Sequence, residues 1–456
     1  MLILKLVSTA LWLSVATGKN PADGQDGGIQ ADQQKILVDS VSEGFVEDSV
    51  ISSPIEVHQV YLTVQDLAQQ KESVRHKAEK EKLLKRLSRD HGKWDAGHPR
   101  WRLLDALHGF RKYFDRNVED VKRWRNFYKH VSPAQKKLLE NTVQYSKKFT
   151  QTEHFLAENQ ALCHRVVNAA LEFYGVDPSE LDEHIKQAEK DKKLAEKVSV
   201  SQALKHLVRD WSEEGLSERG DAFPCLLDTL SGLFPDRLDG EEETKVLLPG
   251  AGLGRLGHEV SALGGFEVTS NEWSMYMNVM SRFLDSQPST ALSEVYPFVD
   301  YWSHHVTNAD MMRKISFPDK PVNSTAVLLV EGDFTTAFSE QNAYFDSVVT
   351  HFFIDTARNL MSYFDTIHRV LKPGGYWVNF GPLLYGTGPF VQLSLEEIIQ
   401  VAEAMGFEFL DTQEKCGDLT MKEGKVRGMT AVYGFNERAL TRNAYNAQFW
   451  VARKKA

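Results

Sequence analysis

The chain has 456 residues, of which 42% are hydrophobic and 25% are charged. This composition is typical of a globular protein and excludes collagen-like, fully disordered and multi-span membrane classes. The length allows two or three domains of about 150 residues each, and a formal net charge of −10 argues against a nucleic-acid partner recognised through overall positive charge. Three cysteines, Cys163, Cys225 and Cys416, lie far apart without a CxxC motif, so we expect them to be unpaired and to form no cysteine-rich metal site.

The first 18 residues have the features of a signal peptide. One early Lys5 precedes an apolar run at residues 6–15, and small residues follow that run. A leader-like extension is the alternative, and the run is too short and too interrupted to span a bilayer. Residues 19–55 are rich in Gly, Asp, Gln and Ser with little periodicity, and we expect a disordered tail there.

Residues 56–200 are expected to form an N-terminal helical region. Basic side chains outnumber acidic ones at residues 71–93, which predicts a solvated helix, with an RNA-binding face as the alternative. Beyond this helix, apolar and aromatic side chains recur at helical spacing, which predicts a helical core, with a base-stacking surface as the alternative. These side chains are Leu103, Leu104, Leu107, Phe110, Phe114, Val121, Trp124, Phe127 and Tyr128. Ser132, ahead of a proline, predicts a helix start, and Gly175 predicts a helix end.

Past residue 221 the pattern changes to short β-branched or aromatic runs separated by helical segments. Strands that alternate with helices predict a mostly parallel α/β sheet covered on both faces. The seven expected strands are residues 245–248, 266–269, 327–330, 347–350, 376–380, 407–410 and 448–452. Ligands of such sheets bind beyond the carboxyl ends of the strands, where strand order reverses, so the residues directly after each strand are the candidate site residues.

A glycine-rich turn follows the first of these strands. From residue 248 the chain reads Leu-Pro-Gly-Ala-Gly-Leu-Gly-Arg-Leu-Gly, so that Gly250 and Gly252 let the backbone approach a ligand closely before a helix begins. At the end of the second strand, Glu272 can accept both ribose hydroxyls of an adenosine. Gly252, Gly254 and Gly257 also satisfy the dinucleotide spacing GxGxxG, and a tight turn without a ligand is a further alternative. The turn and Glu272 together establish only an adenosine site.

Three later features favour a sulfonium cofactor over a dinucleotide. Asp333 and Phe334 follow the third strand, where the carboxylate can meet the adenine amino group and the ring can cover the base. The buried run at residues 345–354 ends in Asp355, which places a carboxylate at the mouth of the cleft. Residues 371–375, Leu-Lys-Pro-Gly-Gly, form a turn between a helix and a strand, an order that looks like the class I S-adenosylmethionine-dependent methyltransferases.

Several strings together resemble the carnosine N-methyltransferase family over most of the chain. They are RDWS at residues 209–212, LPGAGLGRL at 248–256, NEWS at 271–274, GDF at 332–334, FFIDTA at 352–357, LKPGG and GPLLY at 371–375 and 381–385, and FWVARK at 449–454. The resemblance implies a seven-stranded Rossmann-like methyltransferase sheet at residues 201–456, behind an N-terminal helical domain. It also implies S-adenosyl-L-methionine as cofactor and N-methylation of an imidazole nitrogen of carnosine, giving anserine, or of a related small histidine-containing compound.

The resemblance implies roles for individual residues as well. The cofactor-binding set comprises Arg209, Gly250, Gly252, Glu272, Asp333, Phe334 and His351. Arg209 would pair with the methionine carboxylate of the cofactor, with a surface salt bridge as the alternative. Asp355 and Tyr445 would line the acceptor pocket as the catalytic pair. No residue is assigned to a metal.

One position departs from the family's pattern. After Gly-Pro-Leu-Leu-Tyr the family has a histidine that holds substrate, whereas this chain has Gly386. One polar contact to carnosine is therefore missing or supplied from elsewhere. His351 is a candidate substitute, with a strand-end histidine packed in the core as the alternative. A different amine or a histidine in a protein chain is the alternative acceptor.

Methyl transfer from a sulfonium is an in-line displacement in which the protein positions the acceptor, removes its water and fixes its direction. An imidazole nitrogen is nucleophilic only when neutral, with the proton on its other nitrogen. We hypothesise that Asp355 accepts a hydrogen bond from that second N–H and stabilises the developing positive charge, while Tyr445 anchors the rest of the substrate. A helix N-cap ahead of Thr356 is the alternative role of Asp355.

Two other function classes stay open in the sequence. A nicotinamide-dependent oxidoreductase would use the GxGxxG spacing, and a non-enzymatic interaction protein would bind a partner through its helical layer. For a methyltransferase, the expected partners are a small imidazole substrate and, in a homodimer, a second copy of the chain. No nucleic-acid partner and no stable membrane insertion are expected. The methyl donor is made in the cytosol and unpaired cysteines fit a reducing compartment, so we expect cytoplasm and nucleus, with the secretory pathway as the alternative if residues 1–18 are a signal peptide.

Overall fold

The computed structural model describes residues 73–456, with the exception of residues 289, 387 and 422–423. The predicted signal peptide, the predicted tail and the beginning of the predicted helical region lie outside the described residues. Within the described part of the chain, no helix combines the length and the apolar character that a membrane crossing requires.

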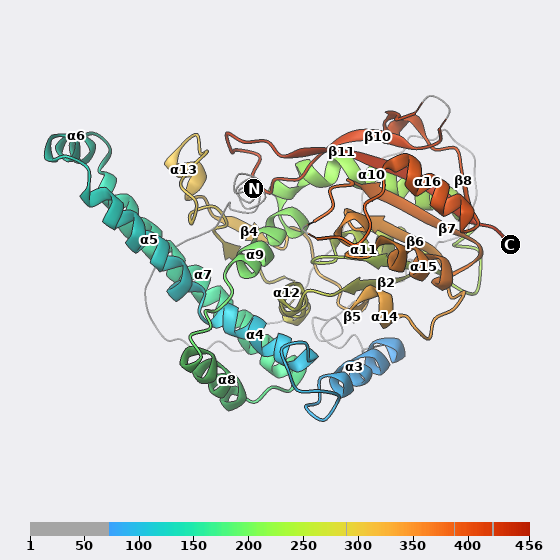
Figure 1. Ribbon diagram of the computed structural model, residues 1–456, viewed down its shortest axis with the longest axis horizontal. Helices are drawn as coiled ribbons and strands as arrows, with labels where there is room; N and C mark the ends of the chain where they lie inside the picture. Colours follow the sequence, from blue (N-terminus) through green and yellow to red (C-terminus); the bar gives the residue numbers. More distant parts are fainter. Residues whose placement is uncertain (1–72, 289, 387, 422–423) are drawn as a thin grey trace, which may run out of the picture.

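A nine-stranded, mainly parallel sheet forms the centre of the fold (Figure 1). Its strands are β1 (Thr244–Pro249), β2 (Phe266–Glu272), β5 (Val327–Glu331), β6 (Phe345–His351), β7 (Leu371–Gly381), β8 (Phe407–Phe409), β9 (Asp418–Leu419), β10 (Arg427–Val432) and β11 (Ala444–Lys454). They are ordered β5-β2-β1-β6-β7-β11-β10-β9, with β8 pairing with β11. The pairs from β5 to β7 are parallel, whereas β11 is antiparallel to β7, β8 and β10. Strand order reverses at β1, so a ligand is expected at its carboxyl end.

All seven predicted strands are present, but the sheet has nine strands rather than the predicted seven. The strands that sequence reasoning missed are β9 and β10. The β10 sequence, Arg-Gly-Met-Thr-Ala-Val, is half-buried without regular alternation, so it lacks the apolar periodicity that indicates a strand. Pairing with β11, which places Ala431 opposite Tyr445, makes this segment a strand although its local sequence does not indicate one. A separate two-stranded sheet joins β3 (Ser293–Val295) and β4 (Ile315–Phe317).

Helices cover both faces of the sheet, as the alternating pattern predicts (Figure 1). One face packs against α14 (Phe334–Ala337), α15 (Leu360–Val370) and α16 (Leu395–Ala404), around the fully buried Trp377 and Trp450. The other packs against α10 (Leu216–Leu233) and α11 (Arg255–Ala262), around Leu226 and Val246. The remaining elements of this half are α12 (Met275–Ser286), α13 (Asn308–Met311) and the short 3-10 helices η1 (Glu213–Gly215), η2 (Ile354–Thr356) and η3 (Glu414–Cys416).

The N-terminal helices form a layer and an arm beside the sheet. They are α3 (Val74–Arg86), α4 (Pro99–Arg111), α5 (Tyr113–Lys129), α6 (Pro133–Val143), α7 (Tyr145–Tyr174), α8 (Pro178–Lys190) and α9 (Val198–Trp211). The predicted helix start and end are confirmed, since Ser132 caps α6 and Gly175 ends α7 in the left-handed region at φ 57°. Residues of α4, α7, α9 and α12 share one hydrophobic core, so the helical layer is joined to the sheet through α12.

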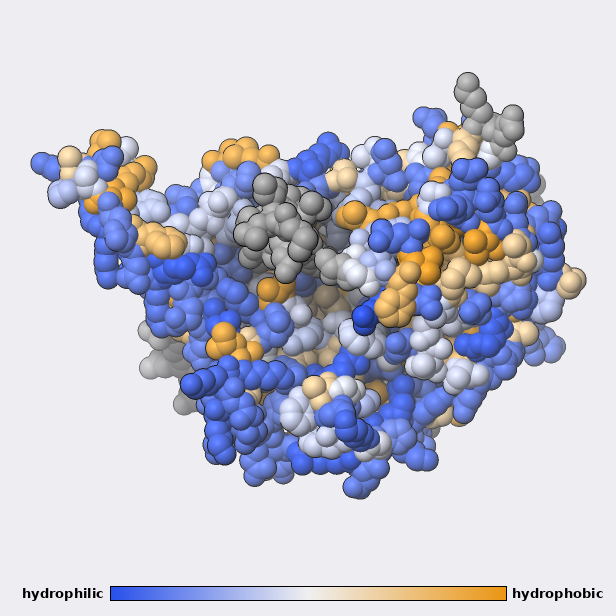
Figure 2. Space-filling view, viewed as in Figure 1, coloured by the Kyte–Doolittle hydropathy of each residue, from blue (hydrophilic) through white to orange (hydrophobic). Residues whose placement is uncertain are grey.

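The predicted helical core holds for most of its side chains, including the fully buried Leu103, Leu107 and Phe110. The exception is Phe127, which is 61% exposed. It lies on the arm made by α5 and α7, which extends away from the sheet and ends in α6 (Figure 1). Phe127, Leu138 and Val143 are the exposed apolar side chains of this arm, and Figure 2 shows apolar surface at its tip.

The first described helix, α3, is not the freely solvated helix that its charge predicts. Its Leu83 is buried. Arg75 donates from Nη1 to the carbonyl oxygen of Val268 at 3.0 Å, and Arg86 donates from Nη2 to that of Glu331 at 2.7 Å. These basic side chains therefore bind carbonyl groups of β2 and β5, a use that charge counting alone could not reveal.

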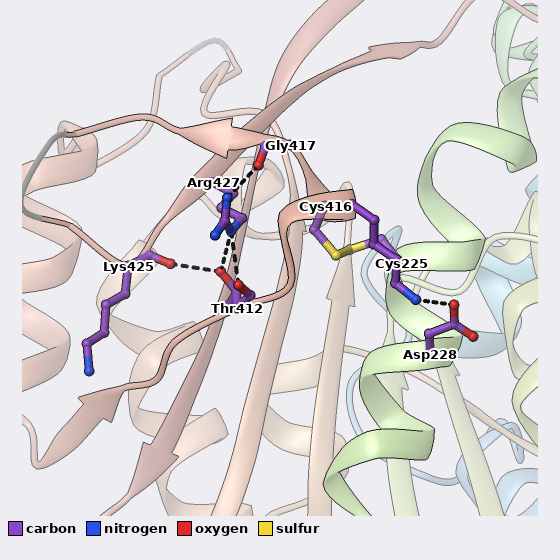
Figure 3. The surroundings of a disulfide bond; sticks show 8 residues. Cys225, Asp228, Thr412, Cys416, Gly417, Lys425 and Arg427 are labelled. Carbon is purple, nitrogen blue, oxygen red and sulfur yellow. Dashed lines mark hydrogen bonds and ion pairs between the residues drawn. A yellow bond between two sulfur atoms is a disulfide. The ribbon is translucent and has the colours of Figure 1, made fainter.

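The expectation of unpaired cysteines is wrong for two of the three. Cys225 of α10 and Cys416 of η3 form a disulfide, with their Cα atoms 5.3 Å apart, while the buried Cys163 is free (Figure 3). The two partners are 191 residues apart in sequence, and they meet because α10 crosses the sheet face beneath β10. Sequence spacing carries no sign of such a pair, because the geometry of the fold decides which cysteines can join.

Candidate active site

The glycine-rich turn lies at the carboxyl end of β1, at the reversal of strand order. Gly250, Gly252 and Gly254 have φ angles of 67°, 59° and 81°, which favour glycine. A side chain at Gly252 would also come within 3.3 Å of the Arg209 guanidinium. Gly257, one turn into α11, lies so close to the sheet that a Cβ atom there would be 3.0 Å from the Ser270 hydroxyl.

Two carboxylates hold the N–H groups of this turn. The Gly252 N–H donates to Oε2 of Glu272 at 2.9 Å, and the Leu253 N–H donates to Oδ2 of Asp210 at 3.2 Å. In a dinucleotide site the same backbone groups would face a pyrophosphate. Because the two carboxylates already occupy them, a phosphate here would meet negative charge, and the turn suits an adenosine compound without phosphate.

Glu272 and Asp333 lie on the same edge of the sheet, on neighbouring parallel strands. Glu272 accepts a second backbone hydrogen bond from Ser274, at 2.7 Å, and burial raises the pKa of its carboxyl group although these N–H groups oppose the rise. The Gly332 N–H donates to the Glu272 carbonyl oxygen, so the ends of β2 and β5 are tied together. Asp333 is exposed and caps α14 through the Thr335 N–H.

The ring of Phe334 is buried beneath this edge. It packs edge-on against Phe353 and Tyr363, with centroid distances of 5.4 and 5.5 Å. Phe353 also lies directly over the turn, because a Cβ atom at Gly250 would clash with its ring. The aromatic rings therefore fix how the β5 and β6 loops meet above the glycine turn.

Arg209 is not a surface salt bridge, since its side chain is 14% exposed and its partners are buried. It donates from Nε to Asp210 at 2.8 Å and lies over the ring of Tyr433 at 5.1 Å. Burial lowers the pKa of Arg209, but the Asp210 carboxylate outweighs this effect and raises the pKa above its usual range. The pKa of Asp210 is held low by Arg209 against the effect of burial, so the pair is charged at neutral pH.

Sequence reasoning missed Asp210 and His206, which surround Arg209 on α9. His206 lies with Nδ1 2.8 Å from Nη2 of Arg209, and burial and Arg209 lower its pKa to about 4. The ring is neutral and accepts from the guanidinium. Asp210 stands inside the RDWS string, but its partner, the Leu253 N–H, lies 43 residues further along the chain.

His351 lies at the end of β6 among aromatic rings. Its ring meets those of Phe223 and Phe352 at 5.8 and 5.1 Å. Burial and the nearby Arg209 lower its pKa to about 3, so the ring is neutral. This packing matches the strand-end histidine that the sequence left open, and the same ring also lines a cavity beside Arg209.

Asp355 follows β6 in η2 and is 7% exposed. Its Oδ2 accepts the N–H of Leu384 at 3.1 Å. It is not the helix N-cap that the sequence left as an alternative, because η2 is preceded by Phe353 and the cap of α15 is Asn359. Burial raises the pKa of Asp355 to about 6, against the effect of the Leu384 N–H. A carboxylate that titrates near neutral pH suits a proton-accepting role.

Three aromatic rings pack together near Asp355: Phe352, Tyr433 and Tyr445. They are here called the acceptor wall, after the acceptor pocket that the sequence predicts at Tyr445. Phe352 stacks on Tyr433 with centroids 4.9 Å apart and planes inclined by 16°, and it meets Tyr445 edge-on at 6.0 Å. Burial, then the neighbouring Tyr433 and Asp355, raise the pKa of Tyr445, which keeps its hydroxyl proton. Sequence reasoning found only Tyr445, because Tyr433 meets it through the pairing of β10 with β11 and Phe352 meets it through the order β6-β7-β11 in the sheet.

The backbone of Phe352, one of the three residues of the acceptor wall, is strained. Its φ is 50°, in the left-handed region that a phenylalanine rarely adopts. The Phe352 N–H donates to the Phe380 carbonyl oxygen at 2.8 Å, and β7 approaches so closely that a side chain at Gly381 would clash with the Phe352 backbone. Strain of this kind is found at sites where function requires it.

The loop after β7 is open around Gly386. No described atom lies within 4 Å of the place where a Cβ atom would stand. Leu384 and Phe390 on either side are 58% and 69% exposed. Among the described residues there is also no group of three His, Cys, Asp or Glu side chains arranged to hold a metal ion.

Comparison with known proteins shows which family this chain is similar to. Residues 186–456 match the family model described as carnosine N-methyltransferase. The carnosine N-methyltransferase of Schizosaccharomyces pombe is 32% identical over 68% of this chain and 83% of its own length, and that of Mus musculus is 31% identical over 78% and 85%. Among solved structures, Haemonchus contortus phosphoethanolamine N-methyltransferase 2 in complex with S-adenosyl-L-methionine aligns over 50% of this chain and 53% of that chain, with 14% identity and a TM-score of 0.29.

Proposed function

Because the chain belongs to the carnosine N-methyltransferase family, we propose that it transfers a methyl group from S-adenosyl-L-methionine to an imidazole nitrogen of carnosine, giving anserine. The observation that carries this proposal is the position of Asp355, a buried carboxylate at the carboxyl end of β6, beside a glycine turn whose N–H groups are held by carboxylates. This arrangement favours a cofactor without phosphate and an acceptor that presents an N–H.

The residues at the end of β1 and β2 fit this cofactor. S-adenosylmethionine supplies a methyl group on a positively charged sulfur. Glu272 would take the ribose hydroxyls, with Gly250 and Gly252 allowing close approach, and Asp333 and Phe334 would lie at the adenine. Arg209, kept charged by Asp210, would take the methionine carboxylate. His351 would border the same end of the site.

Asp355 and the acceptor wall would orient the acceptor. Ionised Asp355 accepts the N–H of the imidazole, so that the other nitrogen presents its lone pair to the methyl group. The positive charge that develops on the ring is stabilised by the same carboxylate. Tyr445 would anchor the remainder of the dipeptide through its hydroxyl group. The loop around Gly386 supplies no described polar side chain to it.

One assay tests the function and the acceptor together. The full chain is incubated with labelled S-adenosylmethionine and, separately, with carnosine, anserine, free histidine or total protein, with Asp355→Ala as control. We expect label on carnosine alone, and none with the variant. Label on total protein without label on carnosine would move the acceptor to a protein histidine, for which the open loop at Gly386 has room.

We also propose a cellular compartment and an assembly for this protein. Cytoplasm and nucleus are the proposed compartments, because the donor is made in the cytosol, and a homodimer is the proposed assembly, supported by the exposed apolar tip of the arm. The Cys225–Cys416 disulfide is more usual in oxidising compartments. Imaging of the tagged full chain checks the compartment, and a signal confined to the secretory pathway would contradict it. Light scattering of the purified protein checks the dimer.

A further inference from the structure

A cavity lies between α10, the end of β6 and the end of β10. It is small and partly open to solvent. Arg209, Glu218, His351 and Tyr433 are among the residues that line it. Charged side chains of both signs thus face one space, next to a neutral histidine and an aromatic ring.

Glu218 has one occupied and one unoccupied carboxylate oxygen. Its Oε1 accepts the N–H of Gly434 at 2.9 Å and also that of Phe435, which holds the end of the β10 strand against α10. Its Oε2 is buried and has no hydrogen-bond partner among the described residues. A buried carboxylate oxygen without a donor is costly, so it requires a reason.

The two arginines around this cavity leave the free oxygen of Glu218 without a donor. Arg209 donates to Asp210, and Arg219, which also lines the cavity, donates from Nη2 to Asp319 at 2.8 Å. His351 is neutral and adds no charge. The cavity therefore presents a carboxylate oxygen that needs a cationic donor.

We propose that Glu218 binds the primary ammonium group of an amino-acid zwitterion whose carboxylate meets Arg209. This inference rests on the proposed function and adds a binding residue to it. Both reactants carry a primary ammonium group: the methionine end of the donor and the amine end of a dipeptide acceptor. A charge-assisted hydrogen bond from ammonium to Oε2 satisfies the unpaired oxygen and requires no movement of Glu218.

The variant Glu218→Gln keeps the size of the side chain and an oxygen for the Gly434 and Phe435 N–H groups, and it replaces the free carboxylate oxygen by an N–H donor. Calorimetry compares its affinity for S-adenosylhomocysteine, which has the ammonium group, with that for 5′-methylthioadenosine, which lacks it. Kinetics compare its KM for carnosine with that for N-acetylcarnosine, whose amine is blocked. Asp221→Asn is the matched control, because Asp221 also lies on α10 and holds the Val432 N–H, at 3.2 Å, but does not line the cavity.

We expect Glu218→Gln to weaken one ammonium-bearing probe by about tenfold to a hundredfold, with the ammonium-free partner changed little. A loss confined to S-adenosylhomocysteine assigns Glu218 to the donor, and a loss confined to carnosine assigns it to the acceptor. Equal losses for both members of each pair, a similar pattern in Asp221→Asn, or no loss at all would overturn the inference. Donor calorimetry needs no methyl transfer, so a failure of carnosine as acceptor would be seen separately.

Discussion

The proposed donor side and the proposed acceptor side of the candidate site are built by different means. On the donor side, carboxylates of Glu272 and Asp210 hold backbone N–H groups of the glycine turn, at 2.9 and 3.2 Å. On the acceptor side, the wall of Phe352, Tyr433 and Tyr445 is held mainly by ring packing, and the loop next to it is exposed. Hydrogen bonds to charged groups thus hold the donor side, whereas contacts between rings hold the acceptor side.

The largest expected effect falls on the acceptor side. Asp355→Asn removes the charge that would orient the imidazole and stabilise its developing positive charge, and we expect kcat to fall by about 10² to 10⁴-fold. Donor affinity should stay unchanged, because Asp355 does not contact the glycine turn. Steady-state kinetics and calorimetry with S-adenosylhomocysteine measure the two quantities. Asp365→Asn, on the exposed side of α15, is the control.

The same variant has a pH signature. Burial raises the pKa of Asp355 to about 6, so turnover by the wild-type protein should rise as pH climbs through this value and the carboxylate ionises. The folded state holds this proton more tightly than the unfolded state, so the residue stabilises the fold at low pH and loses that contribution as pH rises through about 6. At pH 8 Asp355→Asn should therefore be no less stable than wild type. A clear loss of stability there would mean that the variant acts through folding.

Removing the disulfide tests whether the acceptor side depends on the link between α10 and the segment before β10. Cys225–Cys416 ties α10 to the segment that leads into β10, near hydrogen bonds of Arg427 to Thr412 and Gly417 (Figure 3). Removing both cysteines should lower the free energy of unfolding by about 2–5 kcal/mol, since the bond closes a long loop. Denaturant unfolding measures this, with Cys163→Ala as control. We also expect a higher KM for carnosine with unchanged donor affinity, and equal losses on both sides would remove the distinction.

The placement of the proposed donor-side residues at one edge of the sheet could be predicted from sequence because its signals are local. A strand, three glycines and a carboxylate at the end of the next strand lie within a short stretch, and parallel strands bring such ends to one edge. The acceptor wall could not be predicted in the same way. Tyr433 meets Phe352 only through β10, whose half-buried, glycine-containing sequence does not indicate a strand. The disulfide and the contacts of α3 likewise depend on long-range packing rather than on spacing.

On the donor side, Glu272→Gln sharpens the comparison. The amide keeps one acceptor oxygen but loses the charge that receives the Gly252 and Ser274 N–H groups. We expect affinity for S-adenosylhomocysteine to fall by about tenfold to a hundredfold, with KM for carnosine unchanged, as measured by calorimetry and kinetics. Glu267→Gln, at the other end of the same strand β2, should leave both unchanged. A change in the KM for carnosine alone would show instead that Glu272 acts on the acceptor side.

The smallest effect is expected at Tyr445, because its hydroxyl adds an anchor to a wall that is mainly held by ring faces. Tyr445→Phe keeps the edge-on contact with Phe352 at 6.0 Å and removes a single hydrogen bond, so KM for carnosine should rise by about two- to tenfold with kcat and donor affinity unchanged. Tyr376→Phe, on β7 and paired with Arg453 near the other end of β11, is the control. The raised pKa of Tyr445 keeps its proton in place, so this small effect should not vary between pH 7 and 9. A fall in kcat comparable with that of Asp355→Asn would show instead that the hydroxyl and the carboxylate act together on the reacting ring, and the acceptor side would then be as closely fixed as the donor side.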